Sequence, residues 1–311
     1  MALTKVTTGT IADDSIQSLK NRNLVINGAM QVWQRNLTQT STGYGCVDRW
    51  KNTVSGTTTF SQDTASLPTG FEYALRWTTG ASSSYGQSRQ YLETSTVKIL
   101  RGRTLTASSY VKVSGSYSGY VTWEIAYSTT SDSAAGNTWV QLTETSVVTA
   151  SASDASSDYK RISCNVAIPS NAVGLYIGIV PSATQASGQW VSVTGVQLEV
   201  GYVATPFEHE SYGDTLAKCQ RYYQKAVFGA DFEGANSTFY AGAYALPVSM
   251  RATPTLSNVV YPVHISNINT SIGVNGILVL ISSQDYIGWQ TTAASASRAY
   301  GWSYGDLDAE L

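Results

Sequence analysis

Between Asn23 and about Pro206 the chain alternates apolar and polar residues with a period of two. The clearest run places apolar side chains at every second position of 121–127, and similar runs cover 162–168 and 175–179. Successive side chains of a β-strand point to opposite faces of a sheet, so each run predicts a strand with one buried face. Clusters of Gly, Ser, Asn and Asp separate the runs. This arrangement predicts an all-β chain folded as an antiparallel jelly-roll sandwich.

The alternation changes phase once, at Gly195. Val191 and Val193 belong to one phase, and Val196 and Leu198 belong to the other. One extra residue in a strand produces such a change, and Gly marks positions where a strand bulges or bends. We therefore expect a β-bulge at this Gly.

One segment interrupts the β pattern. Ser211 and Asp214 are typical of a helix N-terminus, because their side chains accept hydrogen bonds from the unpaired amides of the first turn. Leu216, Cys219 and Tyr223 then fall at positions i, i+3 and i+7, on one helical face. The pattern predicts a connector helix over 211–225.

The chain is thus expected to have four parts. They are an N-terminal arm over 1–22, the jelly-roll domain over 23–210, the connector helix, and a smaller C-terminal β domain over 226–311. Apolar alternation returns in this last part. Because fewer than ninety residues supply little material for a core, the C-terminal domain is expected to assemble with partner chains.

Charge excludes some classes of partner. Only 13% of the residues are charged, and 19 basic residues face 21 acidic ones. Such a chain is not drawn to nucleic acid or to an anionic membrane by its overall field. No apolar run approaches the ~20 residues of a membrane-spanning helix, so we expect no membrane insertion. Cys46, Cys164 and Cys219 lack disulfide or metal spacing and are expected to be reduced.

Residues that carry catalysis are scarce. The two histidines, His209 and His264, have no second His or Cys at metal-ligand spacing. Glycoside hydrolysis needs two carboxylates brought close together, and the sequence does not show which acids converge. The available acids are Asp48, Asp63, Glu72, Glu93 and Glu124. We expect no catalytic residue, no metal and no cofactor, hence no enzyme. A glycan depolymerase remains an alternative.

Aromatic residues in turn-rich polar surroundings are candidate sugar contacts. An aromatic ring covers the C–H face of a sugar while neutral polar neighbours bind the hydroxyls. The residues that fit are Trp139, Trp190, Trp289, Tyr300, Trp302 and Tyr304. For any single Trp the alternative is a place in the core of the sandwich.

Two stretches carry a resemblance to a known family. The first is Asn23-Leu-Val-Ile-Asn-Gly-Ala-Met-Gln-Val-Trp-Gln-Arg35, followed by Asp48-Arg49-Trp50. The second is Gly195-Val-Gln-Leu-Glu-Val-Gly201, followed by Ala204-Thr-Pro-Phe-Glu208 and Cys219-Gln-Arg-Tyr-Tyr223. In this order they resemble tail-fibre and related virion structural proteins of tailed bacteriophages. In that family the first stretch begins a jelly-roll domain similar to carbohydrate-binding modules, and the second stretch ends it.

The resemblance implies a homotrimeric tail fibre located in the virion and assembled in the host cytoplasm. The arm, with Ile11, Ile16 and Leu19 as candidate docking residues, would attach the fibre to other virion proteins. The C-terminal domain would form a trimeric tip, and the fibre would bind a host surface polysaccharide. A head or tail decoration protein without a receptor remains a second alternative.

Overall fold

The structure is a computed structural model of the chain. It describes residues 22–81, 84–135, 137–143, 146–182, 184–233, 239–266, 277–281, 283–292 and 298–311. The arm residues Ile11, Ile16 and Leu19 lie outside the described residues. The described chain forms two compact units, residues 22–212 with Leu311, and Gly213–Glu310.

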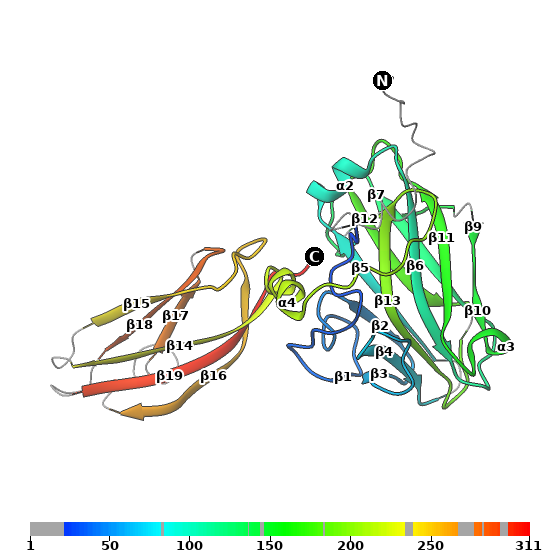
Figure 1. The fold of residues 1–311 in the computed structure, drawn as a ribbon. Helices are drawn as coiled ribbons and strands as arrows, with labels where there is room; N and C mark the ends of the chain where they lie inside the picture. Colours follow the sequence, from blue (N-terminus) through cyan, green and yellow to red (C-terminus); the bar gives the residue numbers. More distant parts are fainter. Residues whose placement is uncertain are drawn as a thin grey trace, which may run out of the picture. The chain divides into compact units, whose positions relative to one another are not determined.

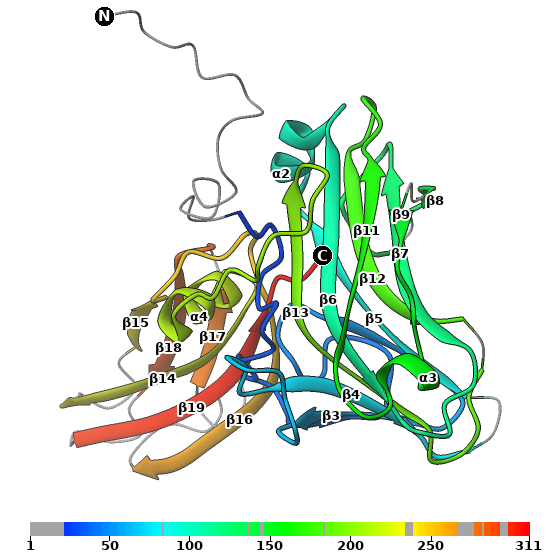
Figure 2. The ribbon, with the colours of Figure 1, turned by 45° about the vertical axis from the view of Figure 1, so that its right-hand side comes forward.

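The first unit is a sandwich of two antiparallel sheets, as the alternation predicts (Figures 1 and 2). The seven-stranded sheet runs, in spatial order, through β1 (Thr38–Gln39), β3 (Thr58–Asp63), β4 (Ala74–Thr79), β13 (Trp190–Val200), β6 (Thr104–Val113), β11 (Lys160–Ala167) and β9 (Ser146–Val147). The six-stranded sheet runs through β10 (Ala150–Ser151), β7 (Tyr120–Ser128), β12 (Gly174–Pro181), β5 (Tyr85–Leu92) and β2 (Lys51–Ser55), with β8 (Val140–Gln141) beside β7. The predicted jelly-roll sandwich is confirmed.

The core of this unit fills the space between the two sheets. Each strand contributes every second residue, so that Trp123 and Ile125 of β7 and Ile177 of β12 are buried in one cluster. Trp50 and Trp77 are fully buried in the same cluster. They therefore fill the core, which is the alternative to sugar contact for a single tryptophan. The opposite face of each sheet is left for other contacts.

The predicted bulge is present. The pairing of β13 with β6 shifts between Thr194 and Gln197, and Gly195 has a φ of +61°. A Cβ at this position would also lie 2.7 Å from the Phe71 ring. Beyond the bulge Gln197 and Glu199 occupy the outer face of the sheet, while Leu198 enters the core.

Two short helices in the first unit were not predicted. They are α2 (Thr94–Leu100) and α3 (Ala152–Ala155). In α2 the residues Val97 and Leu100, three apart, are buried. Its β-branched residues favour strands, so its sequence gives a weak helical signal.

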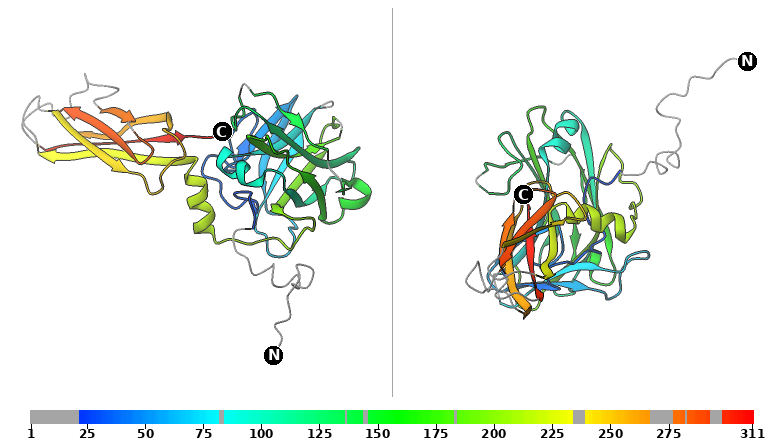
Figure 3. Two further views of the ribbon diagram at one scale, coloured as in Figure 1. Left: turned by 90° about the horizontal axis from the view of Figure 1, so that it is seen from above. Right: turned by 90° about the vertical axis from the view of Figure 1, so that its left-hand side faces the viewer.

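The second unit contains two three-stranded antiparallel sheets (Figure 3). One runs through β14 (Tyr223–Glu233), β19 (Arg298–Asp308) and β16 (Thr255–Ser266), and the other through β15 (Phe239–Ala245), β18 (Tyr286–Thr292) and β17 (Ile277–Ile281). Among its described residues the buried core is small and consists of Ala226, Met250, Ile287, Leu307 and Ala309.

The helix expected over 211–225 is α4 (Tyr212–Gln220), and its length differs from the expectation. It ends at Gln220 because β14 already begins at Tyr223 and pairs there with Asp308. Tyr222 and Tyr223 are buried, and aromatic residues favour strands. In the part of the chain that the structure describes, no helix combines the length and apolarity needed to span a bilayer.

Candidate functional site

The outer face of the six-stranded sheet, called the open face below, carries the candidate site. On β5 it presents Tyr85, Gln87, Arg89 and Tyr91, which alternate with residues directed to the core. Strand register places residues of neighbouring strands in rows across this face. Arg89 lies opposite Gly178 of β12 and opposite Lys51 of β2.

The central row joins an arginine to a glutamate across a glycine. Gly178 pairs with Arg89 on one side and with Glu124 of β7 on the other. The Nε and Nη2 groups of Arg89 both donate to Oε2 of Glu124, at 3.0 and 2.6 Å. A Cβ on Gly178 would lie 2.9 Å from Cγ of Arg89, so the glycine makes room for the arginine to cross β12. Charge-assisted bonds of this kind hold both side chains in a defined geometry.

Aromatic rings pack beside this ion pair. The guanidinium of Arg89 lies 4.8 Å from the centre of the Tyr176 ring, and the Tyr176 hydroxyl donates to Oε1 of Glu124 at 2.9 Å. Tyr91 and Tyr176 are 5.4 Å apart, and Trp139 contacts both edge-on, at 5.4 and 5.0 Å. Burial raises the pKa of Tyr176 and of Tyr91, so both hydroxyls remain protonated donors.

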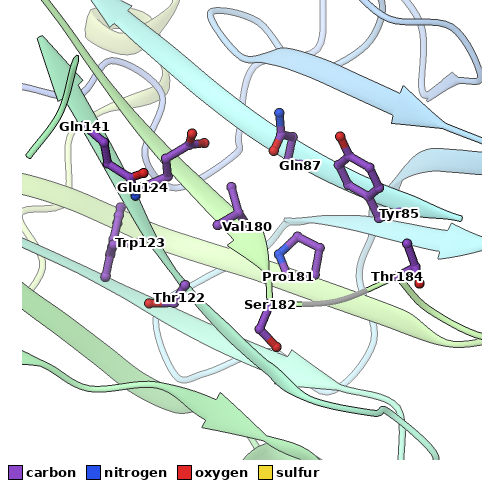
Figure 4. Close-up of a pocket in the computed structure, with 10 residues that line it drawn as sticks. All are labelled: Tyr85, Gln87, Thr122, Trp123, Glu124, Gln141, Val180, Pro181, Ser182 and Thr184. Carbon is purple, nitrogen blue, oxygen red and sulfur yellow. The ribbon is translucent and has the colours of Figure 1, made fainter. Parts of the chain in front are cut away.

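An open pocket of about 380 Å³ continues the face beyond Glu124 (Figure 4). Its lining residues come from β5, β7, β8, β12 and the chain after β12: Tyr85, Gln87, Thr122, Trp123, Glu124, Gln141, Val180, Pro181, Ser182 and Thr184. Val180 and Pro181 lie in the middle of this group (Figure 4). Trp123 differs from the other lining residues because its side chain belongs to the buried core.

The lining combines the chemical groups that a sugar needs. Tyr85 is half-buried and offers a ring, while Val180 and Pro181 offer apolar surface. Gln87 and Gln141 carry neutral amides, which both donate and accept hydrogen bonds. Glu124 adds a carboxylate held in place by Arg89. A small concave site with apolar walls and a few polar groups is the usual form of a ligand pocket.

Glu124 is the one carboxylate among the described residues that line this pocket. Asp63 belongs to the other sheet, where its Oδ2 accepts from Ser192 and pairs with Arg76. Asp48 is buried and pairs with Arg35 at 3.1 Å. The acids weighed as a hydrolytic pair are thus not brought together at the pocket.

The aromatic candidates occupy different places. Trp139 belongs to the ring cluster of the open face. Trp190 lies on the seven-stranded sheet, with the Arg76 guanidinium 4.2 Å from its ring centre. Tyr304, on β19 of the second unit, is 46% exposed. The strands that carry Trp289, Tyr300 and Trp302 are described, but these three side chains lie outside the described residues.

The residues of the first sequence stretch build structure. Asn27, with a φ of +59°, is 3% exposed, as expected for a tight turn with Gly28. Its side chain accepts from the amides of Gln31 and Val32 and donates to the carbonyls of Val32 and Asp48. This network, rather than a ligand, accounts for the motif.

The second stretch covers the outer face of the seven-stranded sheet, called the covered face below. After β13 the segment 201–210 folds back over that face, where Oε1 of Glu199 accepts from the Thr205 amide at 2.9 Å and Oε2 from its hydroxyl at 2.6 Å. Arg161 donates to the Thr205 carbonyl. His209 packs on Phe71, at 4.9 Å between ring centres, so its role there is packing. Among the described residues no cluster of His, Cys, Asp and Glu fits a metal ion.

Sequence reasoning missed Tyr85, Gln87 and Arg89. A signal for them exists, because every second residue from 85 to 91 is a long polar or aromatic side chain, separated by small or amide residues. This alternation predicts a strand whose outer face carries long polar and aromatic side chains. The pairing of Arg89 with Glu124, 35 positions later, depends on the strand order and has no sequence signal.

Comparisons in sequence give no match to any protein-family model or to any curated protein. In structure, the chain is similar to the enzymatically active domain of bacteriophage CBA120 tailspike protein 4, with 12% identity and a TM-score of 0.39. This match covers 58% of this chain and 22% of that chain. It is also similar to the CBM22-1 xylan-binding domain from Paenibacillus barcinonensis Xyn10C, with 10% identity and a TM-score of 0.35. This match covers 54% of this chain and 95% of that chain.

A third similar structure is the C-terminal family 22 carbohydrate binding module of Clostridium thermocellum Xyn10B. The identity is 14% and the TM-score 0.35, over 54% of this chain and 96% of that chain. The similarity to carbohydrate-binding β-sandwiches and to a phage tailspike domain is therefore distant, and the chain is assigned to no sequence family.

Proposed function

We propose that this chain is a bacteriophage tail-fibre protein that binds a host surface glycan on the open face of its sandwich. The observation that carries the binding proposal is the pocket beside the Arg89–Glu124 pair. It places one aromatic ring, apolar surface and several polar side chains on adjacent strands. A flat sugar unit needs this mixture, because it has an apolar C–H face and a rim of hydroxyls.

Four of the lining residues receive a role in this proposal. Tyr85 stacks on the sugar ring, and Gln87 and Gln141 exchange hydrogen bonds with hydroxyls. Glu124 accepts from a hydroxyl, and its orientation is already fixed by Arg89 at 2.6 Å and by Tyr176 at 2.9 Å. Fixing a polar group before the ligand arrives lowers the entropy lost on binding.

The proposed activity is binding without cleavage. Hydrolysis of a glycosidic bond needs an acid and a second carboxylate at about 5–10 Å. Among the described lining residues Glu124 has no second carboxylate beside it, and two of its hydrogen bonds come from Arg89. A carboxylate whose oxygens already accept these hydrogen bonds has no proton placed to give to a leaving group.

The virion setting of the proposal is supported by the order of the two sequence stretches that resemble tail-fibre proteins. In this setting residues 1–22 attach the chain to other virion proteins, and three chains assemble into the fibre. Three copies would bind a repeating polysaccharide more tightly than one copy through multivalency.

The binding proposal is tested with an array of purified bacterial surface polysaccharides and the full-length chain. We expect Tyr85→Ala to weaken binding to the retained polysaccharide about tenfold or more. Tyr202→Ala is the matched control, because Tyr202 is 74% exposed in the segment over the covered face. Equal losses for both variants would overturn the assignment of the site.

The same samples separate the alternatives. Release of reducing ends from the bound polysaccharide would show a depolymerase instead. Normal host adsorption by virions that lack the chain would favour the decoration protein.

A further inference from the structure

The C-terminal unit has a pocket of its own, about 370 Å³ in volume, on the outer face of the sheet β14-β19-β16. It is lined by Lys225, Ala226, Val227, Asn258, Tyr304, Gly305 and Asp306. Register places Val227 opposite Tyr304 and Lys225 opposite Asp306 on adjacent strands. The pocket is therefore formed by two neighbouring rows of side chains within one sheet.

One of these rows is apolar and exposed. Val227 is 58% exposed and Tyr304 is 46% exposed, although Ala226 between the rows belongs to the small core of this unit. An aromatic ring beside an aliphatic side chain leaves a surface that the C–H face of a sugar can cover.

The second row is polar and held in place. Asn258 has a φ of +50°, in the left-handed region, at a register shift between Ser257 and Val260 of β16. Its Nδ2 donates to Oδ2 of Asp306 at 2.8 Å. A bulge re-aims a side chain, and left-handed backbone in a non-glycine residue costs free energy that the surroundings must offset.

The charges of the row do not neutralise each other by direct contact. Lys225 and Asp306 are register neighbours, yet within the part of the chain that the structure describes no ion pair joins them. The ammonium can therefore donate, and the carboxylate and amide can accept, towards a third group in the pocket. Because one positive and one negative charge line it, the pocket favours a neutral polar ligand over an ion.

We propose that this pocket is a second saccharide site, in which Asp306, Asn258 and Lys225 bind adjacent hydroxyls of a neutral sugar and Tyr304 covers its C–H face. The site does not depend on the pocket of the sandwich. If both sites bind, each chain is bivalent, and that consequence rests on the proposed function. Linking two weak sites raises the apparent affinity for a polymer by about 10²–10⁴.

The test is a titration of the ¹⁵N-labelled full-length chain with the methyl glycosides of mannose, galactose, glucose and N-acetylglucosamine, followed by amide chemical shifts. We expect at least one glycoside to shift the amides of Val227, Asn258, Tyr304 and Asp306 with saturating behaviour. Tyr304→Ala and Asp306→Ala should each weaken this response about tenfold or more.

Two further variants keep the test decisive. Asn258→Gly removes the amide but accepts the positive φ, so loss of the response in a folded variant assigns it to the side chain. Tyr244→Ala is the matched control, because Tyr244 is a 39% exposed tyrosine of the same unit outside the pocket, and its response should be unchanged. Circular dichroism checks whether each variant folds.

The outcomes separate this site from the proposed function. Shifts confined to Tyr85, Gln87 and Thr122 would overturn the second site and leave the sandwich site standing. Shifts confined to the C-terminal pocket would support the second site alone. The absence of any shift in this pocket, with an oligomer mass that falls on Tyr304→Ala, would overturn the proposal and identify the face as an interface between copies of the chain.

Discussion

The outer faces of the two sheets of the sandwich are built from similar alternating strands, but the segment 201–210 covers one, whereas part of the other stays open. On the covered face Gln197 and Glu199 are almost fully buried, because the segment 201–210 returns over β13 and its backbone is bonded to their side chains. On the open face the Arg89 and Glu124 side chains remain 23% and 19% exposed beside a pocket. The second sequence stretch, 195–208, stabilises the covered face. The candidate ligand groups lie on the open face.

The largest expected difference concerns a glutamate on each face. Glu199→Ala should lower the free energy of unfolding by about 3 kcal/mol, because it leaves the amide and hydroxyl donors of Thr205 without their acceptor on the covered face. Glu124→Ala should lower it by about 1 kcal/mol, because its ion pair is reached by water. Urea unfolding of both variants measures the two values, and equal losses would break the distinction between the faces.

A smaller effect is expected at the glycine under the ion pair. Gly178→Ala should lower the free energy of unfolding by about 1–2 kcal/mol and weaken glycan binding, because the new Cβ would displace Arg89 and hence Glu124. Gly115→Ala is the control, since a Cβ there meets no atom within 4 Å. Retained binding by Gly178→Ala would show that the geometry of the ion pair does not matter for the ligand.

The last expected effect is absent at neutral pH and develops only in alkaline solution, where it separates Tyr159 from solvent-exposed tyrosines. Burial raises the pKa of Tyr159 to about 12, and the same cause raises that of Tyr117 to about 12. Both hydroxyls keep their protons in the folded chain when unfolded tyrosines have lost theirs, so stability should fall as the pH rises from about 10 towards 12. Tyr159→Phe should reduce this slope in urea unfolding at several pH values. An unchanged slope would contradict the assignment to Tyr159.

Much of the fold follows from local sequence. Alternation places the strands, Gly195 places the bulge, and Asn27 with Gly28 places a tight turn, because each depends on neighbouring residues alone. The end of α4 does not follow from local sequence, because Tyr223 begins β14 and pairs there with Asp308, which is distant in the sequence.

The candidate site was less accessible from sequence. The sequence marks Trp139 as a candidate sugar contact, but its contacts with Tyr91 and Tyr176 depend on strand order. Trp190 shares its turn-rich setting but stacks with Arg76 on the other sheet. Which face the chain covers is decided by the return of the segment 201–210, and alternation alone is the same for both faces.

The central claim, that the ligand occupies the open face, is tested most directly by hydrogen exchange of the full-length chain with and without the polysaccharide that it binds. We predict slower exchange in β5 and β12 and at Ser182 and Thr184, which line the pocket, with the segment 201–210 unchanged. Protection confined to the segment 201–210 or to the edge of the covered face would contradict the account.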